Sequence, residues 1–361
     1  MRLHTSVCDL LGIEYPVFGA PMGGVALVDL AVAVSNAGGC GTLGLTGFRP
    51  DEIRGMVREV RERTNKPFGV GLMFPWDMPP SNVDAPSQLP AFLEPFWVRV
   101  RDLPLPPARP TLTEDLARAQ MAVLVEERVP LLACGLGTPG WVLEQAHAAR
   151  MKVAALVGSV SAAREVAALG VDLVVAQGHE AGGHTGRVTS LVLIPQVVDA
   201  VRVPVLAAGG IADGRGVAAA FALGAQGVWI GTRLLATPEA AAAEVHKRRV
   251  VEMTTDETVV SRCYTGKPSR ILRNAFSDLW ARHQDEILAM PAQRVWMESI
   301  VGRARGAGLV DIVNYPTGQV ATAVRVVKPA GDVVRELVED AIRTLTEKLP
   351  ERVDLSREAD A

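Results

Sequence analysis

The chain has 361 residues, of which 48% are hydrophobic and 21% are charged, and its formal net charge is −3. This length suits one large domain with an elaboration, and the charge gives no electrostatic footprint for nucleic acid or an anionic membrane. The sequence contains no run of 18 apolar residues, so no transmembrane helix is predicted, and the N-terminus lacks the apolar core of a signal peptide.

Short apolar runs alternate with helix-length amphipathic stretches from Tyr15 onward. The first expected strands cover 15–18, 41–44 and 67–73, and the first expected helices cover 27–36 and 50–63. From Pro75 to Pro110 ten prolines interrupt this alternation. Such a stretch is too rich in proline for a helix. It predicts either an ordered loop over the end of the third strand or a partly ordered surface excursion.

Regular alternation resumes at Thr113, with five further strands and a helix before each. The strands are expected at 129–134, 152–157, 172–176, 203–208 and 226–230, and the helices at 113–127, 139–149, 162–169, 191–201 and 213–223. Continuous apolar strands are typical of a parallel sheet that is buried on both faces. The pattern predicts an α/β fold, a closed (β/α)8 TIM barrel. An open doubly wound sheet is the alternative, weakened because no turn carries the G-x-G-x-x-G fingerprint.

The residues after the eighth strand predict an inserted, mostly helical lid subdomain. Helices are expected at 238–249, 277–290 and 294–307, with an extended stretch at 252–262. An amphipathic helix at 332–349 then supplies the eighth barrel helix. The predicted division is therefore a barrel of 1–235 plus 329–350, a lid of 236–328 and a polar tail of 351–361. Because the insertion follows strand eight, we expect the lid over the C-terminal face of the barrel, where barrels carry their active sites.

The loop after the sixth strand is the strongest candidate for a functional site. It reads Gln177-Gly178-His179-Glu180-Ala181-Gly182-Gly183-His184. Glycines at this density let the backbone approach a ligand closely. The two histidines are one residue too far apart for the zinc-protease H-E-x-x-H motif, and the paired glycines disfavour the helix that this motif needs. No catalytic metal is therefore expected.

Two further glycine turns follow strands seven and eight, at Gly209-Gly210 and at Gly231-Thr232. TIM barrels commonly bind a phosphate group at this position. Backbone N–H groups beside helix N-termini supply such an anion site. The alternative interpretation is that both are ordinary connecting turns.

Four stretches then stand out together: Gly-Ala-Pro-Met at 19–22, the loop at 177–186, the turn at 207–216 and Gly-Thr-Arg at 231–233. In combination they resemble the nitronate monooxygenase (2-nitropropane dioxygenase) family, which is related to the FMN-dependent enoyl-acyl-carrier-protein reductase II enzymes. The resemblance covers 8–73 and 113–350. It implies a barrel that binds FMN, with His184 as the active-site histidine. It also implies cofactor contacts at Ala20, Met22, Gln177, Gly182, Gly183, Gly209, Gly210, Trp229, Ile230, Gly231 and Thr232.

One position departs from the family pattern. Members usually carry an asparagine in strand three, where this chain has Gly71. One side-chain contact to the flavin is therefore expected to be missing, or replaced by a water molecule. His179 is the rival to His184 for the catalytic role, but it precedes the glycine pair and is expected to point away from the pocket.

The resemblance implies FMN-dependent oxidation of alkyl nitronates by O2 to a carbonyl compound and nitrite. An NAD(P)H-dependent reductase acting on a quinone or an enoyl thioester is the alternative, and a flavin-binding protein without enzymatic activity is a third reading. The expected partners are a small nitronate or nitroalkane and O2, with neither nucleic acid nor membrane, and a homodimer stays open. The four cysteines lie far apart without a CxxC pair, which predicts free thiols, buried in part, and a cytoplasmic protein.

Overall fold

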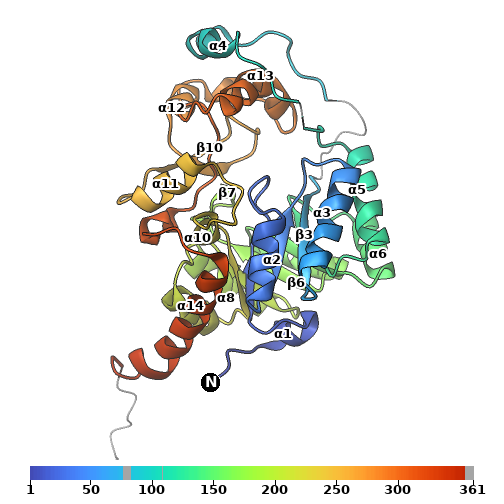
Figure 1. The fold of residues 1–361 in the computed structure, drawn as a ribbon, viewed down its shortest axis with the longest axis vertical. Helices are drawn as coiled ribbons and strands as arrows, with labels where there is room; N and C mark the ends of the chain where they lie inside the picture. Colours follow the sequence, from blue (N-terminus) through green and yellow to red (C-terminus); the bar gives the residue numbers. More distant parts are fainter. Residues whose placement is uncertain (76–82, 108, 354–361) are drawn as a thin grey trace, which may run out of the picture.

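The eight parallel strands form a barrel (Figure 1). The computed structural model describes residues 1–75, 83–107 and 109–353. The strand order is β1-β9-β8-β6-β5-β4-β3-β2. A parallel bridge between Phe18 and Cys40 joins β1 to β2, and the Cys40 N–H donates to the Val17 carbonyl at 2.9 Å. The predicted (β/α)8 fold is thus confirmed. The strands are β1 Val17–Gly19, β2 Gly41–Gly44, β3 Phe68–Met73, β4 Leu131–Gly135, β5 Lys152–Val157, β6 Leu173–Gln177, β8 Val205–Ala208 and β9 Gly227–Ile230.

Helices surround the barrel and bury their apolar faces against the outer side of the strands. The eighth helix, expected at 332–349, is α14 (Ala330–Arg343), which packs between α9 and α2 and so completes the ring. Among the helices of the described ranges, none is long and apolar enough to cross a bilayer. The others of this layer are α2 Val28–Asn36, α3 Pro50–Arg63, α5 Glu114–Glu126, α6 Gly140–Ala148, α7 Val160–Leu169, α8 Ser190–Ala200 and α9 Gly214–Ala222.

A separate buried cluster fills the inside of the barrel. Phe18 and Trp229 stack there with ring centroids 5.8 Å apart. The short helix α1 (Ser6–Leu11), below the barrel in Figure 1, adds Val7 and Leu11 to this cluster and closes the N-terminal end. Because this end is plugged by apolar side chains, a ligand has access to the barrel only from the opposite, C-terminal end of the strands.

A third buried cluster lies above that C-terminal end. It is built from 91–100 and 235–324, and we call this region the cap. A three-stranded antiparallel sheet connects the cap to the barrel: β10 (Thr258–Ser261) pairs with β11 (Ser269–Leu272), which pairs with the two-residue strand β7 (Gly183–His184). The cap helices are α4 Glu94–Val100, α11 Glu244–Glu252, α12 Ala275–Trp280 and α13 Ala292–Gly306, and the short α10 (Thr232–Leu235) leads into them.

Two helix predictions in the cap are wrong in extent. The helix expected at 238–249 begins only at Glu244, because the Ala241 N–H donates to the Val25 carbonyl at 2.9 Å instead of to a helical acceptor. The helix expected at 277–290 ends at Trp280. Beyond it, the Leu288 N–H donates to the Gln293 side chain at 3.0 Å, which replaces a helical hydrogen bond.

The proline-rich stretch 75–110 also differs from expectation, because it contains the helix α4. Pro95 lies in the first turn of α4, where a helix needs no N–H donor. Phe96 and Val100 of α4 are buried in the cap core, and α4 packs against α13. Residues 76–82 and 108 of this stretch lie outside the described residues, as do 354–361 of the expected tail. The division into a barrel and a lid of 236–328 stays a prediction.

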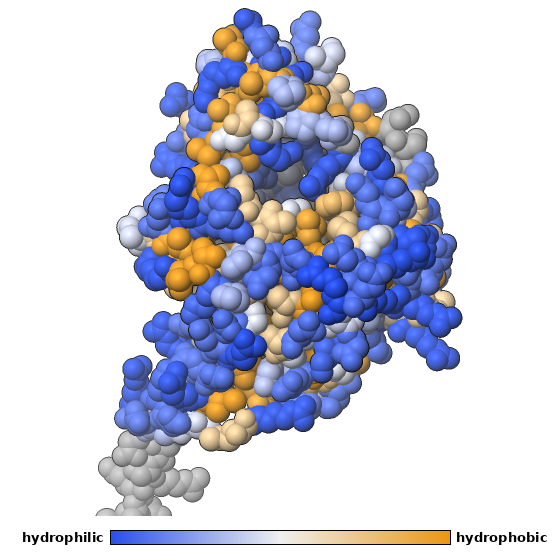
Figure 2. Space-filling model, viewed as in Figure 1, coloured by the Kyte–Doolittle hydropathy of each residue, from blue (hydrophilic) through white to orange (hydrophobic). Residues whose placement is uncertain are grey.

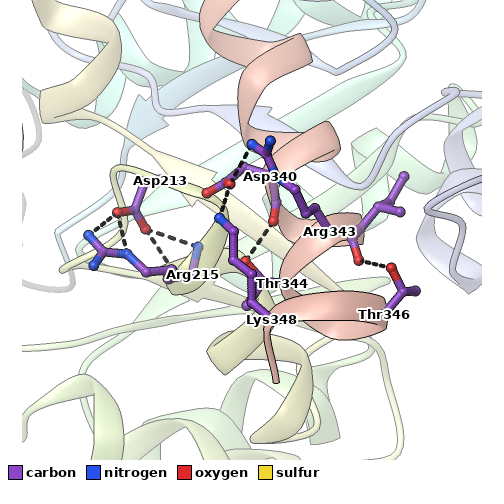
Figure 3. Close-up of polar contacts among 9 residues, drawn as sticks. Asp213, Arg215, Asp340, Arg343, Thr344, Thr346 and Lys348 are labelled. Carbon is purple, nitrogen blue, oxygen red and sulfur yellow. Dashed lines mark hydrogen bonds and ion pairs between the residues drawn. The ribbon is translucent and has the colours of Figure 1, made fainter. Parts of the chain in front are cut away.

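The start of α9 lies directly against α14, and a glycine allows it to do so. A Cβ built at Gly214 would lie 2.3 Å from the backbone nitrogen of Ala341. Figure 3 shows the polar groups around this contact, where the Asp213 carboxylate caps α9 and pairs with Arg215 at 2.5 Å. From α14, Asp340 pairs with Lys348 at 2.6 Å. Gly214 therefore allows the start of α9 to pack closely against α14.

We expect Gly214→Ala to lower the free energy of unfolding by about 1–3 kcal/mol, because the added methyl group would overpack the α9–α14 contact. Gly140→Ala at the start of α6 is the matched control, since a Cβ there meets nothing within 4 Å. Urea unfolding of both variants measures the difference. Equal unfolding free energies for the two variants would show that α14 yields to the extra volume.

Candidate active site

The candidate site lies where the loops after the barrel strands meet the cap. Figure 2 shows that the surface is hollowed between the cap and the barrel, with hydrophilic residues bordering the hollow. The loop after β6 carries His184 and enters the cap sheet as β7. The turn after β1 contacts the turn after β9, because the Ala20 N–H donates to the Ile230 carbonyl at 2.9 Å and a Cβ at Gly231 would lie 3.9 Å from the Met22 sulfur.

His179 and Glu180 hold the shape of the loop after β6. The backbone N–H of Ser190, the first residue of α8, donates to both carboxylate oxygens of Glu180 at 3.2 Å. Glu180 thus satisfies a free donor at a helix N-terminus, where negative charge is favoured. The His179 Nδ1–H donates to the Gly186 carbonyl at 2.6 Å, and its backbone N–H donates to Val188 at 2.8 Å. The His179 ring is therefore held by a hydrogen bond within the loop itself.

The cap strand β11 fixes the other half of this loop. Ser269 pairs with His184 and Arg270 pairs with Gly183. The buried Arg270 side chain donates through Nε and Nη2 to the His179 carbonyl at 3.2 Å. At the end of β6, Gln177 donates from its side chain to the His184 carbonyl at 2.5 Å. The backbone of His184 is therefore held from the barrel and from the cap.

The His184 imidazole is neutral at pH 7. Burial lowers its pKa to about 4, and the positive charges of Lys267 and Arg294 act in the same direction. Nε2 of His184 lies 3.0 Å from the Thr265 hydroxyl, which itself donates to the Lys267 carbonyl at 3.3 Å. A hydroxyl has a single proton, so this network assigns the imidazole proton to Nε2 and leaves a lone pair on Nδ1.

The backbone around the two glycine turns fits an anionic group. Gly209 and Gly210 have φ values of +95° and +74°, in the left-handed region that favours glycine. Within the described ranges, the N–H groups of Gly210, Gly231 and Thr232 donate to no backbone or side-chain acceptor. Amide groups in such turns need a partner, and a phosphate group supplies one. This donor set therefore fits the phosphate of a flavin mononucleotide.

Three of the expected contact residues face protein instead of the hollow. The Trp229 side chain stacks on Phe18 inside the barrel, and the Ile230 side chain is buried between barrel and helices. A Cβ at Gly182 would lie 2.7 Å from the backbone nitrogen of Gly318, so this glycine allows a close approach of the cap. From these three positions a bound cofactor would be reached by backbone atoms, and their role as contacts stays a prediction.

The departure at Gly71 has a steric explanation. A Cβ built at Gly71 would lie 2.2 Å from Cβ of Pro21, so the proline ring occupies the space above this residue. An asparagine side chain at 71 would require the turn after β1 to move.

Four residues near the site were missed by the sequence analysis. Thr265, Lys267 and Arg294 belong to the cap and approach His184 only in three dimensions. The fourth is Gly318, whose N–H donates to the Thr232 hydroxyl at 2.9 Å. The Pro-Thr-Gly run at 316–318 is a turn signal that could have drawn attention to this position. Nothing in the pattern links Arg294 to the barrel.

Comparison with known proteins gives consistent results. A family model described as nitronate monooxygenase matches residues 4–340. A Mycobacterium tuberculosis protein, named as a candidate monooxygenase, is 38% identical over 95% of this chain and 98% of its own. The structure of FabK from Thermotoga maritima superposes with a TM-score of 0.80 at 34% identity, covering 98% of this chain and 100% of that one.

A nitroalkane oxidase from Streptomyces ansochromogenes superposes with a TM-score of 0.81 at 31% identity, covering 95% of this chain and 99% of that one. Matches of this extent establish an oxidoreductase, and they agree with the barrel and with the motifs that carry the family resemblance. The chain belongs to the nitronate monooxygenase family.

Proposed function

We propose that the protein binds FMN and oxidises alkyl nitronates with O2 to a carbonyl compound and nitrite. The observation that carries this proposal is the uncharged imidazole of His184 in positively charged surroundings. A nitronate is an anion, and the charges of Lys267 and Arg294 favour its approach. An uncharged imidazole with a free lone pair is also suited to accept the proton that a neutral nitroalkane loses when it becomes a nitronate.

We assign the FMN phosphate to the N–H groups of Gly210, Gly231 and Thr232. The fit of these unpaired donors to an anion supports the assignment. The turn at Ala20–Met22, beside Gly231, and the end of β6 at Gln177 would then border the ring system. When bound, the flavin supplies the redox chemistry, taking electrons from the substrate and passing them to O2.

The chain's own residues would bind the substrate and move its proton. The positive charge of Arg294 contributes to the lowered pKa of His184, and the same charge would favour a nitro group beside the imidazole. Nδ1 of His184 takes the α-proton of a neutral nitroalkane, whereas a nitronate needs no proton removal. The Thr265 hydroxyl keeps the ring oriented through Nε2.

A reductase that takes hydride from NAD(P)H and reduces a quinone or an enoyl thioester is the second candidate. The similarity to FabK over nearly the whole chain supports this second candidate function. Anaerobic mixing of the flavin-loaded protein with NADH, NADPH or an alkyl nitronate separates the two, because the reductant that bleaches the flavin identifies the electron donor. Bleaching by a nicotinamide nucleotide alone would contradict nitronate oxidation.

We expect Gly231→Val to lose most of its flavin, because the added side chain would extend from the proposed phosphate donor toward Ala20 and Met22, which border the proposed flavin site. This position is suitable because φ at Gly231 is −106° and a Cβ there meets its nearest atom, Cβ of Ala20, at 3.6 Å. Gly210→Val is a less direct test, because a Cβ there would lie 3.2 Å from Oε1 of Glu180 and its left-handed backbone also strains the variant. The ratio of FMN to protein in the denatured supernatant measures the effect. A folded Gly231→Val variant with stoichiometric FMN would place the phosphate elsewhere.

His184→Asn should keep FMN and the fold but lose roughly 10²-fold or more in kcat/KM, because a positioned acid or base contributes about 10²–10⁴-fold. A neutral nitroalkane tests proton transfer, and its nitronate tests binding and orientation. His179→Asn is the control, since the His179 ring bonds within its own loop. If His179→Asn lost more activity than His184→Asn, the catalytic assignment would move to His179.

The pH profile should reflect the lowered pKa of His184. The group must be unprotonated to act as a base, so kcat/KM for a neutral nitroalkane should stay high from neutral pH down to about pH 5. It should fall only as the pH approaches the pKa of about 4. Initial rates with the fold checked by circular dichroism at each pH give the profile. An acidic limb near 6.5, the ordinary value for histidine, would show that the ring is not desolvated.

A further inference from the structure

Two arginine side chains from distant segments meet at the turn after β2. Arg294 comes from α13 in the cap, and Arg109 from the segment before α5. A Cβ built at Gly47, in that turn, would lie 3.6 Å from Nη2 of Arg294 and 3.3 Å from Cδ of Arg109. The two positive groups are therefore neighbours at the junction between the cap and the barrel.

Packing holds the Arg109 guanidinium group in place. Its central carbon lies over the Phe48 ring, 4.6 Å from the centroid. A Cβ built at Gly24 would lie 3.1 Å from each of its two terminal nitrogens, and φ at Gly24 is +71°. A side chain at position 24 would thus displace the guanidinium. Among the described residues Arg109 forms no ion pair, and Glu52 and Glu298 act on its charge only over a longer distance.

Neither guanidinium group has an anionic partner in the part of the chain that the structure describes. Arg109 and Arg294 form no ion pair and no hydrogen bond there, whereas the nearby Arg305 pairs with Glu298 at 3.6 Å. Burial lowers the pKa of Arg294; Glu298 opposes this, while the charges of Arg305 and Arg109 add to it. Arg294 is half-buried whereas Arg109 is exposed, and a half-buried cation among like charges is costly unless an anion neutralises it.

We propose that Arg294 and Arg109 form a second anion site, which binds the phosphate or pyrophosphate group of a substrate or cosubstrate whose other end reaches His184. Two unpaired guanidinium groups match a dianion, and their planar forks suit phosphate oxygens. A monoanionic carboxylate would leave one positive charge unbalanced. Gln293, the residue before Arg294, donates to the Cys263 carbonyl at 2.7 Å, and Cys263 lies two residues before Thr265, whose hydroxyl contacts His184. These contacts place the second site close to the reacting end. This inference rests on the proposed function in one respect, which is that His184 marks the place where the substrate reacts.

Isothermal titration of the flavin-loaded protein with inorganic pyrophosphate, at constant ionic strength, tests the site directly. We expect binding to weaken roughly ten- to a hundredfold in Arg294→Gln and in Arg109→Gln, as for the loss of a charged hydrogen bond. Arg294→Lys should retain part of the affinity, because it keeps the charge and loses the fork. Arg215→Gln is the matched control, since Arg215 at the start of α9 already pairs with Asp213, so this variant should bind pyrophosphate as the wild type does.

Undiminished pyrophosphate binding in the Arg294→Gln, Arg109→Gln double variant would overturn the proposal, and so would acetate binding as tightly as pyrophosphate. Competition identifies the carrier of the phosphate. Displacement of pyrophosphate by NADH or NADPH assigns the site to a nicotinamide nucleotide, and displacement by coenzyme A assigns it to a thioester. If neither the nicotinamide nucleotides nor coenzyme A displaced pyrophosphate, the proposal that this site holds part of a substrate or cosubstrate would be overturned. Because no turnover is involved, these results are independent of whether nitronates are oxidised.

Discussion

The pairing of Gly183–His184 with Ser269–Arg270 is the contact on which the site depends. It makes one loop belong to two sheets, since the loop leaves the barrel at the end of β6 and enters the cap sheet as β7. In a strand, a shift of one residue turns every side chain to the opposite face. The register with β11 therefore decides which way the His184 ring points, and the same hairpin supplies Thr265 to orient it.

Local charge at the site differs in sign from the charge of the whole chain. The chain carries a formal net charge of −3, yet at this site burial, together with the positive charges of Lys267 and Arg294, lowers the pKa of His184 to about 4. Clefts lined by one sign of charge concentrate ligands of the other sign. The backbone amides at Gly210 and Gly231 add hydrogen-bond donors on the barrel side of the site. An anionic cofactor and an anionic substrate can thus share a small volume.

The barrel was predictable because its signal is local. Continuous apolar runs and capped amphipathic helices depend on neighbours in the sequence, and α3 begins and ends where the pattern places it. The His184 loop was likewise visible as a cluster of glycines beside polar groups. What the sequence did not show arises from contacts across the chain. His184 and Thr265 are 81 positions apart, and the collision between Gly71 and Pro21 exists only in the folded barrel.

The core of the cap is built from two separate stretches of chain. Phe96 and Val100, which precede α5, are buried together with residues that follow strand β9. An exchange of 236–328 between relatives would therefore transplant only part of a hydrophobic core and leave the other part facing a foreign surface. A substitution that changes the volume of one stretch therefore alters the packing of the other. The insertion after β3 and the insertion after β9 therefore share one hydrophobic core, although the barrel segment from Glu114 to Ile230 lies between them.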